Sequence, residues 1–311
     1  MPQEPNAALL TNPWLRYWLA TRPAFLAASL IPVLIGAAAV AYSGYPISWT
    51  LLFFTLIGTA LVHSGVNVLN DYYDEENGTD RRNQQRIFPF TGGSRFIQNE
   101  VMALEETFVF GVGLLLAAIA LGLYLAWESG AALLVIGLAG LLVGWGYSAP
   151  PLQLNSRGLG EPAVALGFGV LTPLGTWFVQ TGMLSFYPVM VGFPTALLVM
   201  NILYINQFPD READAASGKH HWVVRLTLDK SPVIYLGAVM AAAISLMLMV
   251  ANEFLPIWSI ISLLPLVLAF KAGLDLQQFA AQPNKLEPAI KMTIASMVLH
   301  GLLLTATLWL G

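Results

Sequence analysis

The chain has 311 residues, 57% of them hydrophobic and 10% charged, and its mean hydropathy is +0.67. Soluble globular proteins carry about 25% charged residues, so the composition predicts an all-α integral membrane protein with no room for a sizeable soluble domain. The net charge of −4 leaves no basic field for nucleic acid, and the lack of cysteine excludes disulfides, thiolate metal sites and thiol catalysis.

A polar, proline-containing segment, residues 1–22, precedes the first apolar run, and we interpret that run as a membrane anchor. About 20 apolar residues cross a bilayer as a helix. Nine stretches meet this requirement and predict a bundle of about nine transmembrane helices: 23–42, 49–69, 107–127, 130–148, 162–180, 187–208, 232–251, 255–271 and 291–310.

Lysine and arginine lie before the first span and after the even-numbered spans, and the opposite connections contain neither residue. Positive charge marks the cytoplasmic side of a membrane protein. We therefore predict a cytoplasmic N-terminus, an external C-terminus, and a cytoplasmic position for the polar segments that follow the second and sixth spans.

Two acidic motifs occupy those segments. The first runs from Asn67 to Asp80 after the second span, and the second runs from Asn206 to Asp214 after the sixth. The motifs lie four spans apart and point the same way. This predicts a single domain over 1–311, built as a parallel pseudo-repeat of 23–148 and 162–271 with an additional ninth helix.

The spacing within each motif places its oxygen-bearing side chains on one helix face. Carboxylates at membrane depth are functional by default, and clustered hard oxygen ligands suit Mg²⁺ bound to a phosphorylated substrate. Asp80 follows Gly78 and also fits a simple turn. The predicted ligands, which face one another across one metal–diphosphate site, are Asp71, Asp74, Asp80, Asp210 and Asp214, supported by Asn67 and Asn206.

Three stretches resemble motifs of the UbiA-type membrane prenyltransferases. The first is Asn70-Asp-Tyr-Tyr-Asp with Asn77-Gly-Thr-Asp and Thr91-Gly-Gly-Ser, and the second is Ile205-Asn-Gln-Phe-Pro-Asp-Arg-Glu-Ala-Asp through Val-Val-Arg-Leu226. The third is Tyr147-Ser-Ala-Pro-Pro through Arg157-Gly-Leu-Gly-Glu161. The finer pattern is most similar to 1,4-dihydroxy-2-naphthoate polyprenyltransferases of menaquinone synthesis.

The resemblance implies Mg²⁺-dependent transfer of a polyprenyl group from an isoprenyl diphosphate to an aromatic acceptor, within a prokaryotic plasma membrane and at its cytoplasmic face. It implies catalytic roles for Asp71, Asp74, Asp210 and Asp214. It also implies substrate-binding roles for Asn67, Asn206, Arg22, Lys219, Arg157 and Tyr147.

Two departures from the family pattern concern the loops. Gln153 stands where a basic residue is expected, which puts the diphosphate contacts in doubt. His220-His221-Trp222 replaces a more usual basic, hydroxyl and aliphatic sequence, and we interpret this change as loop packing. For His63 and His300, both within apolar spans, we predict interhelical hydrogen bonds.

Other functions stay open. The acceptor of a related prenyltransferase is 4-hydroxybenzoate, homogentisate, chlorophyllide, heme or a glycerol phosphate. A cation- or phosphate-coupled transporter is disfavoured, because transporters bind substrate near the midplane through broken helices. A non-catalytic lipid- or quinone-binding bundle does not need a doubled acidic motif. The oligomeric state and the prenyl chain length are not predicted.

Overall fold

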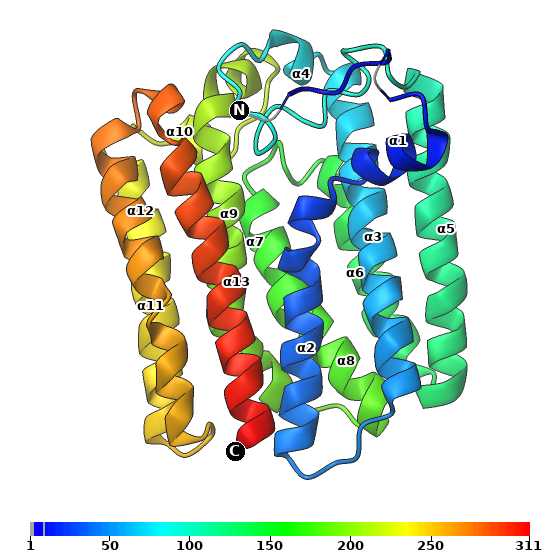
Figure 1. Ribbon diagram of the computed structural model, residues 1–311, viewed down its shortest axis with the longest axis vertical. Helices are drawn as coiled ribbons and strands as arrows, with labels where there is room; N and C mark the ends of the chain where they lie inside the picture. Colours follow the sequence, from blue (N-terminus) through cyan, green and yellow to red (C-terminus); the bar gives the residue numbers. More distant parts are fainter. Residues whose placement is uncertain (1–2, 9) are drawn as a thin grey trace.

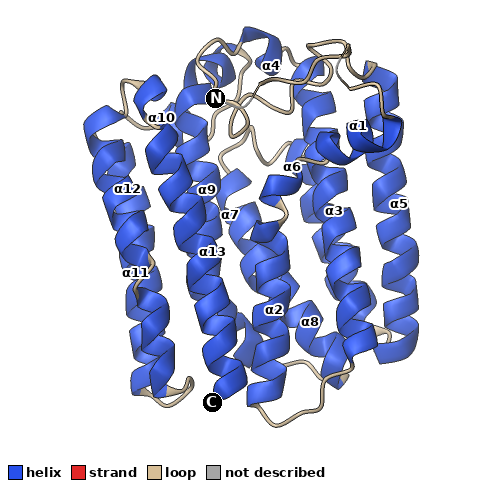
Figure 2. Cartoon of the chain, in the orientation of Figure 1, coloured by secondary structure: helices blue, strands red, loops and turns tan. Residues whose placement is uncertain are grey.

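The structure, a computed structural model, describes residues 3–8 and 10–311, and within them every regular element is a helix (Figure 2). The α-helices are α1 Pro13–Ala20, α2 Ala27–Tyr42, α3 Trp49–Glu76, α4 Thr79–Arg82, α5 Leu104–Ser129, α6 Ala132–Ser148, α7 Gly160–Leu166, α8 Thr172–Thr181, α9 Tyr187–Ala216, α10 Trp222–Arg225, α11 Ser231–Ala251, α12 Leu266–Phe279 and α13 Glu287–Leu310.

Eight helical segments in the described part of the chain are long and apolar enough to cross a bilayer. The stretch predicted as the fourth span is α6, which has only 17 residues and falls below that length. The prediction of an all-helical integral membrane bundle is therefore confirmed. The count of nine spanning helices, the side of the N-terminus and the pseudo-repeat stay predictions.

The two helices that carry the acidic motifs are longer than the membrane requires. α3 has 28 residues and α9 has 30, which gives each a length of about 40–45 Å against a hydrocarbon core of about 30 Å. α9 stays helical through Pro194 and Pro209. The second motif, and the first motif as far as Glu76, are consequently terminal turns of membrane helices, whereas Asp80 lies on the short helix α4 that follows.

The predicted fifth span is interrupted. It consists of α7, a π-helical stretch at Gly167–Leu171, and α8, which together form one segment of 22 residues. π-Helical stretches are rare and occur often at functional sites. The predicted eighth span is also composite, since a 3₁₀ helix at Ile257–Leu263 precedes α12.

The main apolar core lies where α2, α9, α11, α12 and α13 pack together. Many polar groups inside it are hydrogen-bonded, as in the bond of 2.8 Å that the Tyr204 hydroxyl donates to the Ser231 carbonyl, whereas Asn201 Oδ1 and His300 Nε2 are buried without a partner in the described residues. Figure 1 shows α3, α5 and α6 on the other side of α2 and α7 from α11, α12 and α13. The helices that carry the two motifs, α3 and α9, thus belong to different parts of the bundle.

One end of the bundle holds the long connections. In Figure 1 the N-terminal segment, α1, α4 and α10 all lie at this end, and the C-terminus lies at the other. Residues 83–103 run across it without regular structure, apart from turns. This segment is tied to the N-terminal segment by Glu4, which accepts hydrogen bonds from Arg86 at 2.8 Å and from Asn99 at 3.2 Å. The polar end is therefore closed by chain from two distant regions.

Candidate active site

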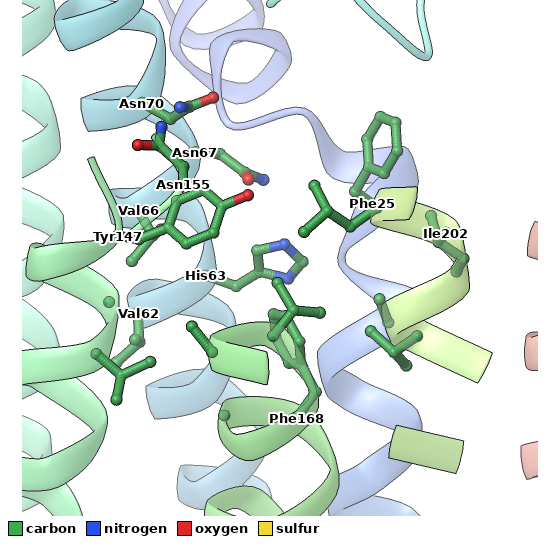
Figure 3. A pocket seen from close by; sticks show the side chains of 18 of the residues that line it. Phe25, Val62, His63, Val66, Asn67, Asn70, Tyr147, Asn155, Phe168 and Ile202 are labelled. Carbon is green, nitrogen blue, oxygen red and sulfur yellow. The ribbon is translucent and has the colours of Figure 1, made fainter. Parts of the chain in front are cut away.

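A cavity of about 410 Å³ opens between α2, α3, α6, the α7–α8 segment and α9. Its end near α4 is polar, and the larger remainder is lined by aliphatic and aromatic side chains such as Val62, Ile136 and Phe168. Figure 3 shows this transition, with Asn67, Asn70 and Asn155 above His63 and with Phe168 below it. One cavity can therefore hold a charged head group at its polar end and a hydrocarbon tail in its apolar part.

The two acidic motifs meet at Lys219, which follows α9. Its ammonium lies 2.8 Å from Asp74 Oδ1 on α3 and 3.1 Å from Asp214 Oδ1 on α9. Burial opposes the charge on Lys219, but Asp214 and Asp74 outweigh it and raise the pKa of the ammonium above its usual value. One buried cation thus joins the first motif to the second.

Asp71 lies beneath the Thr91–Ser94 turn. The Ser94 N–H donates to its carboxylate at 3.2 Å and 3.3 Å, and the Arg22 guanidinium lies 3.7 Å from it. Arg22 has φ +58, in the left-handed region that side chains rarely occupy. The structure therefore pairs Asp71 with Arg22, although Asp71 itself is not among the residues that line the cavity.

The same turn contacts the second motif. The Gly92 N–H donates to Asp210 Oδ2 at 3.3 Å, and the Asn83 amide donates to Oδ1 at 2.5 Å. Gly93 adopts φ +72, and a Cβ there would meet the carboxylates of Asp80 and Asp71, with 3.1 Å to Asp71 Oδ1. Only glycine allows the turn to lie this close to both carboxylates.

Asp80 is buried and only partly neutralised. The Arg95 guanidinium donates to its backbone carbonyl at 2.6 Å, whereas its Oδ2 atom is buried and accepts no hydrogen bond within the described residues. Burial, followed by the neighbouring Asp74 and Asp71, raises the pKa of this carboxyl well above its usual value. A carboxylate in this state favours the arrival of a cation.

The two predicted asparagines both line the cavity. Asn67 donates to the Thr21 carbonyl at 3.1 Å, and the Oδ1 atom of Asn206 is buried without a partner in the described chain. The Oε1 atom of Gln207, the next residue in the chain, is also buried without a partner in the described residues. Unpaired buried acceptors destabilise a fold unless a ligand or ion satisfies them.

No group of three acidic or histidine side chains in the described residues is close enough to hold a metal ion without rearrangement. Mg²⁺ commonly uses only one or two carboxylates, with waters and substrate phosphates as its other ligands. The unpaired oxygens of Asp80 and Asn206 are hard donors of the kind that Mg²⁺ prefers. The residues present therefore fit a magnesium ion that arrives with a phosphorylated substrate.

Among the other predicted substrate-binding residues, Arg22, Lys219 and Tyr147 line the cavity. Arg157 does not, because its side chain is exposed and its carbonyl accepts a hydrogen bond of 2.7 Å from Arg225. Gln153 also lies outside the lining. The structure thus brings Tyr147 to the site and leaves Arg157 away from it.

Most of the remaining basic residues near the motifs are engaged elsewhere. Arg86 pairs with Glu4, and Arg211 donates to the Val223 carbonyl at 2.9 Å. Arg82 is exposed and bonds Ser217. Within the described residues, the cations that line the cavity are Arg22 and Lys219.

Three residues at the site were not predicted from the sequence. Asn70 donates to Asp74 at 3.2 Å, Asn83 donates to Asp210, and His221 Nε2 lies 3.0 Å from Asp214 Oδ2. The interpretation of His220-His221-Trp222 as loop packing holds for Trp222, which donates from its backbone and its indole to Glu161 and Gly158. It is wrong for His221, since that side chain lines the cavity and contacts a motif carboxylate.

Asn70 is part of the quoted Asn-Asp-Tyr-Tyr-Asp stretch, so its position beside Asp71 was a usable signal. Asn83 and His221 carry no such signal, because their contacts depend on how two loops fold over the helix ends.

A sequence profile of the UbiA prenyltransferase family matches residues 29–297. The chain is 28% identical to a 1,4-dihydroxy-2-naphthoate octaprenyltransferase of Mycobacterium leprae, over 94% of this chain and 96% of that protein. It is 30% identical to the enzyme of the same name from Bacillus subtilis, over 73% of this chain and 70% of that protein.

The fold is similar to the solved structure of a UbiA homologue from Archaeoglobus fulgidus bound to GPP and Mg²⁺. The TM-score is 0.63 at 15% identity, with 94% of this chain and 99% of that chain covered. At this identity the likeness concerns the fold alone.

Proposed function

Since the chain belongs to the UbiA prenyltransferase family, and is an intramembrane prenyltransferase acting on an aromatic acceptor, we propose that it prenylates 1,4-dihydroxy-2-naphthoate. The donor is an isoprenyl diphosphate and the required metal is Mg²⁺. The names of the relatives from Mycobacterium leprae and Bacillus subtilis support this acceptor. The proposal includes an active site at the cytoplasmic face of a prokaryotic plasma membrane, and the charge asymmetry of the loops supports this side.

The observation that carries the proposal is the junction at Lys219. Carboxylates from α3 and α9, far apart in the sequence, share this one ammonium at the polar end of a cavity whose remainder is apolar. A diphosphate with a hydrocarbon tail requires this combination of charged head and apolar body. Neither a transporter site at the midplane nor a simple lipid pocket requires it.

The residues that would hold Mg²⁺ are the five motif aspartates with Asn67 and Asn206. When bound, the metal neutralises charge on the departing diphosphate. The Archaeoglobus fulgidus homologue bound to GPP and Mg²⁺ supports the metal and the substrate class.

Lys219 and Arg22 hold the diphosphate itself. An ammonium has three N–H donors, and Lys219 directs two of them to Asp74 and Asp214. The third donor is left for a phosphate oxygen. Arg22 retains unused donors, since its Nε atom is buried without a hydrogen-bond partner in the described chain. Charge on the leaving group is thus stabilised by groups that are already in position.

The apolar wall protects the reacting carbon. As the bond between the allylic carbon and the diphosphate oxygen breaks, that carbon gains carbocation character, and water would capture it. Val66, Val164, Phe168 and Leu203 line the cavity with apolar side chains, and such a lining disfavours water beside the reacting carbon. The acceptor ring then attacks the allylic carbon, and the ring carboxyl leaves as CO₂.

The test is direct. Purified protein is incubated with labelled isoprenyl diphosphates of several lengths, Mg²⁺ and a panel of aromatic acceptors, and products are identified by mass. We expect the preferred product to be prenylated naphthoate without its carboxyl. Transfer to 4-hydroxybenzoate or homogentisate in its place would refute the acceptor, and no transfer to any acceptor would refute the proposed reaction.

A further inference from the structure

His63 lies on α3, one turn before Asn67, and its side chain is 91% buried. Its Nδ1 atom lies 2.9 Å from the Ser29 hydroxyl on α2. The interhelical hydrogen bond predicted for this residue is therefore confirmed. The bond uses only one of the two ring nitrogens, and the other nitrogen has a different environment.

The hydrogen bonds around Ser29 assign the tautomer of His63. The Ser29 hydroxyl donates its single proton to the Leu26 carbonyl at 2.9 Å. It must therefore accept from His63, so that Nδ1 carries the N–H. A neutral imidazole has only one N–H, and apolar burial without a bonded carboxylate favours the neutral form. The Nε2 atom consequently presents a lone pair.

That lone pair has no donor within the described residues, although the side chain lines the cavity. The imidazole packs on Phe168 with 5.0 Å between ring centroids, and Phe25 and Tyr147 line the same region. Figure 3 shows the His63 ring projecting into this space between its polar and apolar parts. Unlike Nε2 of His300, which is buried within the protein, Nε2 of His63 is accessible from the cavity. It can therefore accept a hydrogen bond from a ligand that has a hydrogen to donate.

The chemistry of the proposed ligands selects one of them. An isoprenyl tail has no hydrogen-bond donor, and a diphosphate bound to Mg²⁺ offers only acceptors. A hydroxylated aromatic ring is the one proposed ligand that donates. His63 precedes Asp71 by eight residues, about 12 Å along α3, which places it below the carboxylates, where the allylic carbon enters the apolar part.

From this geometry we infer that His63 Nε2 accepts a hydrogen bond from a ring hydroxyl of the aromatic acceptor and fixes the ring's orientation. The inference rests on the proposed function and deepens it. Phe168 supports the imidazole from one side, and Ser29 acts as a positioning residue that holds the tautomer. This hydrogen bond would select an acceptor ring that carries a hydroxyl at the matching position. It would also set how that ring faces the prenyl donor.

The first test replaces His63 with two amides. An asparagine amide lies near the position of Nδ1 and does not reach that of Nε2, whereas a glutamine amide extends to Nε2. We expect His63→Asn to lower kcat/KM for the acceptor about tenfold to a hundredfold, with KM for the prenyl diphosphate unchanged. His63→Gln should recover much of the loss. A His63→Asn variant with wild-type kinetics for the acceptor would overturn the inference.

The matched control is His300→Asn. His300 is also a buried intramembrane histidine, with Nδ1 2.8 Å from the Ser262 carbonyl, and it does not line the cavity. We expect this variant to keep wild-type kinetics. If both histidine variants lower kcat/KM equally for the acceptor and for the prenyl diphosphate, the effect of the His63 substitution is structural and the inference is overturned.

The second test varies the substrate. Acceptors with one ring hydroxyl replaced by a methoxy group are compared in wild type, His63→Asn and His63→Gln. Wild type should discriminate at least tenfold against one of the methyl ethers, and His63→Asn should lose that discrimination. Equal discrimination in wild type and His63→Asn would overturn the inference about His63 and leave the proposed function standing. Failure of wild type to prenylate any acceptor would overturn the proposed function with it.

Discussion

Replacing Lys219 with methionine tests the arrangement at the junction of the two motifs. The ammonium lies among carboxylates that are also the predicted metal ligands, within 2.8 Å of Asp74 and 3.1 Å of Asp214. It therefore repels any divalent cation that binds there. Removing it should strengthen Mg²⁺ binding in the absence of substrate and weaken the binding of prenyl diphosphate.

The magnitude follows from the charges. Two unit charges 4 Å apart interact by about 1 kcal/mol in water and by about 4 kcal/mol at an effective dielectric constant of 20. A divalent ion doubles these values. Lys219 is buried, with 6% exposure, so the value in water is a lower bound, and about 2 kcal/mol corresponds to a gain of at least roughly thirtyfold in Mg²⁺ affinity.

Removal of the ammonium also leaves its two carboxylates without their shared partner. Breaking a buried ion pair by deleting one member costs about 3–5 kcal/mol of stability. The Lys219→Met variant should therefore melt at a lower temperature without Mg²⁺ and recover part of the loss when Mg²⁺ is added.

The assay is isothermal titration of Mg²⁺ into detergent-solubilised protein, with thermal melting measured alongside. Lys230→Met is the control, since Lys230 is an exposed lysine in the connection before α11, and it should leave Mg²⁺ affinity unchanged. A Lys219→Met variant whose Mg²⁺ affinity is equal to or weaker than that of wild type would refute the arrangement.

Three further predictions follow from contacts at the polar end. Asp71→Asn or Asp210→Asn should lower prenyl transfer by about a hundredfold or more while the protein remains folded in detergent; unchanged turnover in both variants would count against the assigned site. Gly93→Ala should lower both melting temperature and activity, because its positive φ and its contacts with Asp80 and Asp71 leave no room for a methyl group; wild-type behaviour would contradict this. Glu4 should release the N-terminal segment in acid. Burial opposes its ionisation, but bonds from Arg86 and Asn99 outweigh burial and lower its pKa from 4.5. The stabilisation is thus present above pH 4.5 and is lost as pH falls through the lower folded value. Limited proteolysis should show this loss in wild type, and an unchanged profile in Glu4→Gln is the control.

The membrane architecture could be predicted because hydropathy reports directly on burial in lipid. The acidic motifs could be placed for a related reason, since Asp71 and Asp210 continue the helical spacing of the spans that precede them. Where the structure differs from the interpretation of the sequence, the local hydropathy pattern does not determine the backbone conformation. The break at Gly167–Leu171 is set by packing against α9, and apolar composition continues through it unchanged.

The loops set a second limit on prediction. Arginine is a residue type expected to bind phosphate, but the side chain of Arg157 is exposed to solvent. The Gly92 and Ser94 N–H groups contact carboxylates 118 and 23 residues away in the chain. Every residue except proline has a backbone N–H, so the sequence does not show which N–H groups bind a carboxylate until the path of the loop is known. Neither contact was therefore predictable.

α3 and α9 are continuous rods, with carboxylates at one tip and shafts embedded among the other helices and lipid. A rod transmits a change of tilt to its end without bending. A thinner or thicker bilayer alters the tilt that best covers each apolar shaft, and it thereby changes the spacing between the two acidic tips. We therefore expect the activity of the reconstituted protein to depend on the thickness of the bilayer.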